Sequence, residues 1–160
     1  MFFWYLGPSV IGIHEVFRSR GLDYRLIALG SLLPVLLDAP TGHVGYGHSM
    51  VLVVAVLTLV MVGTIGRSRL LRRRLVCVPI GWFCGLVLSG AFLHDHAFLW
   101  PLLGSDPGHV GLLPPPTLLV LAEASGLAIV IWSVGRFGLN RPGPRTAFLE
   151  TGRLVEVEAK

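Results

Sequence analysis

The chain has 160 residues, of which 53% are hydrophobic and only 14% are charged, and its mean hydropathy is +0.72. Soluble domains carry about 25% charged residues, so this composition argues against an ordinary soluble fold. The formal net charge of +4 would suit nucleic acid, but the basic residues lie between apolar runs, as orientation signals of membrane proteins do. We therefore expect a protein whose main partner is the lipid bilayer, and no nucleic-acid partner.

The first two apolar segments are short. A helix that crosses a bilayer core of ~30 Å needs ~20 apolar residues. Phe2–Phe17 contains Gly7, Pro8 and Glu15, and Leu26–Leu37 contains Pro34. Each segment could cross, or the two could form a re-entrant pair covered by protein.

Three later segments have spanning length: Ser49–Gly66, Leu75–Leu93 and Thr117–Gly135. The sequence therefore predicts an all-α fold, a polytopic transmembrane bundle of about five segments within residues 1–135. Residues 136–160 are more polar, and we expect them to form a cytoplasmic tail.

The basic residues predict an orientation. With five crossings, all thirteen Lys and Arg side chains fall on one face of the bundle. The positive-inside rule makes that face cytoplasmic. The N-terminus is then expected outside and the C-terminus inside.

The loop between the second and third segments gathers polar side chains. Asp38, His43 and His48 lie within eleven residues of glycine-rich chain. Metals such as zinc take three or four N or O ligands, and these three residues are candidates. The alternative is an interfacial loop in which Asp38 and His48 cap helices.

Two further groups could carry chemistry. His94 and His96 form a His-x-His pattern that suits a metal in an extended chain, or a solvated turn beside Trp100. Glu123 is a lone acid in the last apolar segment, where a carboxylate is costly unless it is paired or protonated. It predicts either a functional group or a hydrogen bond to a neighbouring helix.

Short motifs in a fixed order resemble those of the bacterial membrane-bound metal-dependent hydrolases. They are the run from Gly30 to Pro40, then Gly47-His48-Ser49, Gly81-Trp82, and Phe98-Leu99-Trp100-Pro101-Leu102. The resemblance implies an inner-membrane protein with a divalent metal, such as zinc, near Asp38, His43 and His48. A metal-bound water would be the nucleophile.

The chain departs from the family pattern at four positions. Val35, Gly85 and Ser89 stand where the family carries Asp, His and Asp, and Tyr5 stands where it carries His. The resemblance thus implies a hydrolase-like protein whose centre is reduced or lost. The alternatives are a non-catalytic membrane protein that binds a lipid or protein partner, and a small transporter that uses Glu123.

Overall fold

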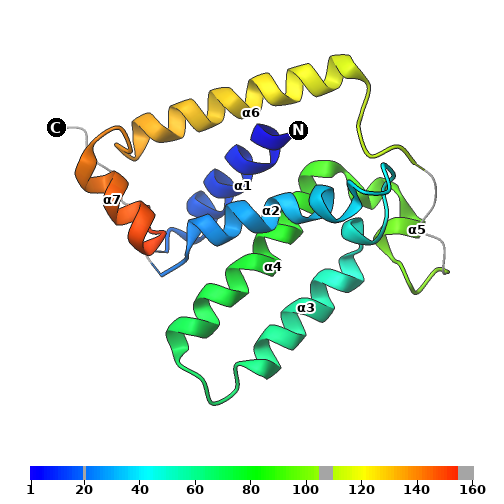
Figure 1. Ribbon diagram of the computed structural model, residues 1–160, viewed down its shortest axis with the longest axis horizontal. Coiled ribbons are helices and arrows are strands. Elements are labelled where there is room, and N and C mark those ends of the chain that lie inside the picture. Colours follow the sequence, from blue (N-terminus) through cyan, green and yellow to red (C-terminus); the bar gives the residue numbers. More distant parts are fainter. Residues whose placement is uncertain (20, 105–109, 155–160) are drawn as a thin grey trace.

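The computed structural model describes residues 1–19, 21–104 and 110–154 and is all-helical over that part of the chain. Helices α3 and α4 form a hairpin on one side of α2, and α1 lies between α2 and α6 (Figure 1). The elements are α1 (Phe2–Phe17), α2 (Tyr24–Asp38), the 3-10 turn η1 (Tyr46–His48), α3 (Met50–Gly63), α4 (Arg69–Ser89), the 3-10 turn η2 (Ala91–Leu93), α5 (Asp95–Phe98), α6 (Pro116–Arg136) and α7 (Pro142–Thr151).

Glycines bring α2 and α4 into backbone contact. A Cβ atom on Gly81 would collide with the Ile27 carbonyl, and one on Gly85 would collide with the Ser31 carbonyl. Gly30 of α2 meets the α4 backbone in the same way. Small residues four apart let two helices approach closely, which is common between helices in membranes.

A second close contact joins α1 to α6. Gly126 lies against the backbone at Phe3 and Trp4, where no Cβ would fit. Beside it, Glu123 accepts a hydrogen bond of 2.9 Å from the Phe3 amide and pairs with the Met1 amino group at 2.6 Å. Glu123 therefore has its partners at the start of α1.

The prediction of about five spanning segments is wrong. Among the described residues, only α6 is both long and apolar enough to cross a membrane. Ser49 caps α3, and the helix ends after 14 residues at Gly63, a length of about 21 Å. The 21-residue α4 starts within the basic segment at Arg69 and stops at Gly90, which adopts a left-handed conformation. Capping and charge thus shorten the apolar helices.

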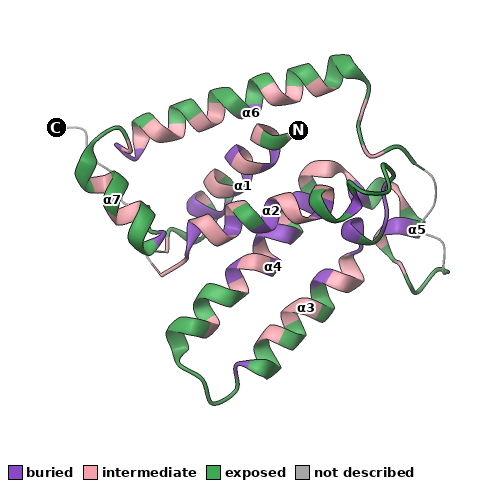
Figure 2. Cartoon of the chain, viewed as in Figure 1, coloured by how far each residue is buried: buried purple, intermediate pink, exposed green. Residues whose placement is uncertain are grey.

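Many large apolar side chains are exposed. They include Leu59 and Val62 of α3, and Val120, Leu121 and Ile131 of α6. Figure 2 shows both helices mostly as exposed or intermediate, with the buried residues gathered around α1, α2 and α4. Exposed apolar surface of this extent is typical of contact with lipid or with another protein.

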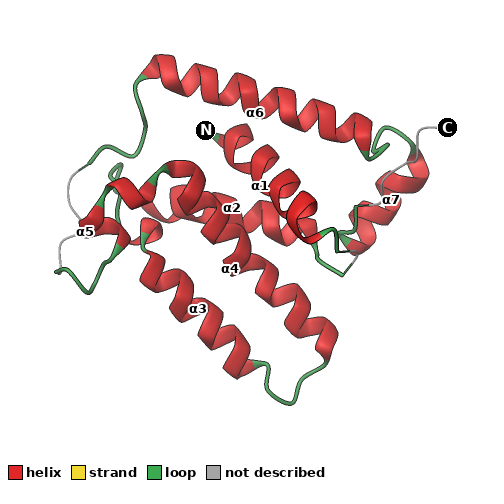
Figure 3. Cartoon of the chain, turned by 180° about the vertical axis from the view of Figure 1, so that it is seen from behind, coloured by secondary structure: helices red, strands yellow, loops and turns green. Residues whose placement is uncertain are grey.

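The described part of the predicted tail, residues 136–154, packs against α1 and α2. Helix α7 follows α6, and beyond it Leu154 is 5% exposed in a core with Ile13, Tyr24, Ile27 and Phe137. The Gly152 carbonyl accepts a hydrogen bond of 2.9 Å from the Tyr24 amide. Figure 3 shows α7 from behind, next to the start of α2. Residues 155–160 of the predicted tail lie outside the described residues.

We expect Glu123→Leu to destabilise the protein by about 1–3 kcal/mol, because the amide and amino group at the start of α1 lose their acceptor. Glu123→Gln keeps an acceptor for the Phe3 amide and should cost less. Chemical unfolding in detergent would measure both, with the exposed Glu150 replaced in the same two ways as the control. Equal stability of both Glu123 variants and the parent would contradict the role assigned to Glu123.

Candidate functional site

Asp38 is the centre of a compact polar site at the C-terminal end of α2. Its carboxylate accepts hydrogen bonds from the amides of Gly45 at 2.7 Å and Gly47 at 2.8 Å. Nδ1 of His48 lies 2.6 Å from Oδ2. Both side chains are only 3% exposed. The glycine-rich loop folds back on α2 because one buried carboxylate binds three of its groups.

The charge state of Asp38 fixes the tautomer of His48. Burial alone would raise the pKa of Asp38, but the hydrogen bonds from His48, Gly47 and Gly45 together lower it. The carboxylate is therefore ionised at neutral pH and only accepts, so Nδ1 of His48 carries a proton. In the neutral imidazole, Nε2 then holds a lone pair.

Two tryptophans that lie outside the loop in the sequence form hydrogen bonds with it. Nε1 of Trp82 donates to the Gly47 carbonyl at 2.7 Å, and Ser49 Oγ donates to the Trp100 carbonyl at 2.6 Å. The rings of Tyr46 and Trp100 also pack, with 4.6 Å between their centres. Residues from α2, α4 and the segment at Trp100 thus meet around one loop.

His48 lines a pocket of about 380 Å³, called here the His48 pocket. Tyr5, Ser89 and His94 line the same pocket, and the segment from Val110 to Pro115 forms one wall. Burial, with a smaller effect from Glu123, raises the pKa of Tyr5 to about 12. Its hydroxyl is therefore a neutral hydrogen-bond donor at physiological pH.

The other predicted ligands lie apart from this pair. His43 is exposed, its Nδ1 lies 2.7 Å from the Thr41 carbonyl, and its backbone pairs with Gly111. His96 is exposed, whereas His94 reaches the pocket. Within the described part of the chain, no three His, Cys, Asp or Glu side chains are grouped to hold a metal ion. The metal site remains a prediction from the sequence.

Four residues were singled out in the sequence as departures from a motif pattern: Tyr5, Val35, Gly85 and Ser89. Tyr5 and Ser89 line the His48 pocket. Gly85 instead packs on Ser31 and Pro34 of α2, where a histidine side chain would separate the helices. Val35 accepts through its carbonyl the hydrogen bond that ends α2 at Ala39.

Several contributors to the site were not predicted. The amides of Gly45 and Gly47 and the indole of Trp82 act through the backbone or from a distant helix. The sequence signals for them are the Gly81-Trp82 motif and the glycines at positions 45 and 47, which flank Tyr46 between the two histidines. Such glycines indicate a close approach of the backbone to another group.

No protein-family model, curated protein or solved structure matches the chain. Over its described residues, the chain is a helical protein with one helix long and apolar enough to cross a membrane.

The lowered pKa of Asp38 predicts an acid-sensitive site. The folded state binds a proton at Asp38 less readily than the unfolded chain, whose carboxyl titrates near ~3.9. The stabilisation is thus present above that pH and is lost as the pH falls through the lower folded pKa. Carboxyl ¹³C NMR should show Asp38 titrating below the ordinary value of an Asp carboxyl, about 3.9. Titration of Asp38 at or above that value would contradict the hydrogen bonding described.

Proposed function

We propose that the chain is a membrane-associated protein of the hydrolase-like class and that its reactive group is His48. The Nδ1–Oδ2 contact of 2.6 Å between His48 and Asp38 carries this proposal. A buried carboxylate that accepts from Nδ1 orients the ring, leaves Nε2 basic and stabilises the imidazolium that forms during proton transfer.

The proposed reaction is hydrolysis of a small carboxylic ester. Nε2 of His48 takes a proton from water while the water oxygen attacks the ester carbonyl. The Tyr5 hydroxyl donates to the oxygen that becomes negative. The imidazolium then returns its proton to the leaving alkoxide as the carbon–oxygen bond breaks. An ester suits the pocket better than a phosphate, because no Lys or Arg among the described residues lines it.

A divalent metal fits the pocket less well than this general-base role. The Asp38 carboxylate already accepts hydrogen bonds from His48 and from two backbone amides, so it acts as an orienting group and not as a metal ligand. Among the described residues, His48 and His94 are then the two imidazoles that line the pocket, and zinc sites use three or four ligands. We therefore derive no step through a metal.

Ester turnover by the purified protein tests the proposal. Fluorogenic esters of increasing acyl length would be compared between the parent, His48→Gln and the exposed control His43→Gln. Turnover should fall about 10²–10⁴-fold in His48→Gln, as expected for loss of a general base, and remain in His43→Gln. Equal turnover in all three proteins, or none in the parent, would support a non-catalytic binding protein instead.

We further propose that α6 inserts into the membrane with its C-terminal end on the cytoplasmic side. Arg136, Arg141 and Arg145 follow its apolar part, and basic residues favour the cytoplasm. Cysteines at Leu113 and Asn140, in a Cys84→Ala background, can be labelled with an impermeant reagent in intact cells. Position 113 should react and position 140 should not. The reverse pattern would overturn the orientation.

A further inference from the structure

A second pocket lies at the other end of α2 from the His48 pocket. It has a volume of about 400 Å³ and is called here the arginine pocket. Arg73 and Arg74 of α4 line one side, and Arg153, just after α7, lines another. The Arg73 guanidinium lies against Gly21, where a Cβ would be 3.0 Å from Nη1. Two consecutive arginines of α4 and a third that follows α7 therefore line one cavity.

The charge of this pocket is not balanced by the described residues that line it. Asp23 is the acid among them, is 5% exposed and is already paired with Arg25 at 3.1 Å. Arg74 lies 3.9 Å from the same carboxylate. Arg73 and Arg153 form no ion pair with any described residue. Ser68, the N-cap of the 21-residue α4, also lines the pocket, and a helix N-terminus adds a positive partial charge.

We propose that the arginine pocket binds a phosphate group. Guanidinium groups present paired N–H donors that match the oxygens of a phosphate. The walls also include Leu70 and Leu71, so the bound group would be partly shielded from water. A phosphate on a lipid headgroup and a phosphate on a soluble molecule share this chemistry.

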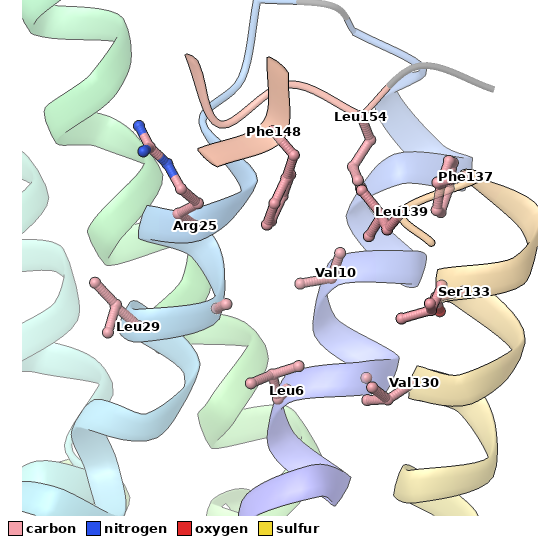
Figure 4. Close-up of a pocket in the computed structure, with 13 residues that line it drawn as sticks. Leu6, Val10, Arg25, Leu29, Val130, Ser133, Phe137, Leu139, Phe148 and Leu154 are labelled. Carbon is pink, nitrogen blue, oxygen red and sulfur yellow. The ribbon is translucent and has the colours of Figure 1, made fainter. Parts of the chain in front are cut away.

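A neighbouring apolar pocket favours the lipid as the source. It has a volume of about 430 Å³ and is lined by apolar side chains of α1, α2, α6 and α7 (Figure 4). Arg25 lies at its edge and bonds to Asp23 of the arginine pocket. Leu154 lines the apolar pocket and Arg153 the arginine pocket, so the two lie next to each other. A phosphate and an attached hydrocarbon chain thus have adjacent sites.

Binding to the full chain in detergent tests the proposal. The probes are inorganic phosphate, glycerol 3-phosphate and dihexanoyl phosphatidic acid, with dihexanoyl phosphatidylcholine as the zwitterionic control, measured by calorimetry. Arg73→Gln with Arg153→Gln should weaken binding of the phosphate probes about tenfold or more, since two charge-assisted contacts are lost. Arg67→Gln with Arg69→Gln removes the same charge from residues that do not line the pocket, and should bind like the parent.

The probes also identify the source of the phosphate. Tighter binding of the short-chain lipid than of glycerol 3-phosphate indicates a lipid, and equal binding indicates a soluble molecule. The proposal would be overturned if the Arg73/Arg153 and Arg67/Arg69 double variants lost the same affinity for the phosphate probes. It would also be overturned if the probes bound only after Glu156→Gln with Glu158→Gln. Glu156 and Glu158 lie outside the described residues. No step of this test depends on ester turnover, so its result is independent of the role proposed for His48.

Discussion

Gly81→Ala is expected to separate α2 from α4 and to destabilise the protein severely. The new methyl group would meet the carbonyl oxygen, carbonyl carbon and Cα of Ile27, which are backbone atoms that cannot move alone. Overpacking of side chains typically costs about 1–3 kcal/mol. A collision with the backbone should destabilise the protein by at least the upper value of that range. Because α2 carries Asp38 and α4 carries Trp82, the site should be lost together with the packing.

Gly12→Ala is the matched control. Gly12 lies within α1, and a Cβ there would meet nothing within 4 Å. Alanine should stabilise this helix by about 0.5–1 kcal/mol, because glycine loses more backbone freedom on folding. Unfolding in detergent, followed by circular dichroism, would compare the two variants. Similar effects of both substitutions would show that α2 and α4 are not packed through Gly81.

Asp38→Asn is expected to have the second large effect, on activity as well as stability. An Asn side chain offers one acceptor oxygen to a site that has three donors, and its amide group would face at least one N–H. Lost hydrogen bonds to a charged group cost about 1.5–3 kcal/mol each. Ester turnover should fall about 10⁴-fold, as it does when a triad aspartate is replaced and the histidine takes the wrong tautomer.

Asp95→Asn is the control for this substitution, because Asp95 is exposed at the start of α5. Its stability and turnover should match those of the parent. The KM for the ester should change less than kcat in Asp38→Asn, since Asp38 acts through His48 and does not line the pocket. A loss of turnover explained by KM alone would assign Asp38 to substrate binding and contradict its positioning role.

The positions of the helices could be predicted from the sequence, but their relation to the membrane could not. The apolar segments Phe2–Phe17 and Thr117–Gly135 correspond closely to α1 and α6. Hydropathy also located α3 and α4, but capping by Ser49 and the left-handed turn at Gly90 set their ends. Those ends decide whether a helix is long enough to span, and they depend on local hydrogen bonds that an apolar run does not reveal.

The sequence grouped Asp38, His43 and His48 as candidate metal ligands. The structure brings Asp38 and His48 together, with the carboxylate hydrogen-bonded to His48, and leaves His43 exposed. Glu123 binds the start of α1, which lies 120 residues away in the chain. Spacing within a loop can indicate which residues meet, whereas partners from distant helices depend on packing through glycines such as Gly81 and Gly126.

Every role proposed for His48 depends on the proton at Nδ1. ¹⁵N NMR of the imidazole in the purified protein measures this directly, because protonated and unprotonated ring nitrogens have distinct shifts and couplings. When the imidazole of His48 is neutral, Nδ1 should carry the proton and Nε2 should be unprotonated, and this tautomer should be lost in Asp38→Asn. A neutral His48 protonated at Nε2, or a tautomer unchanged in Asp38→Asn, would contradict the site as described.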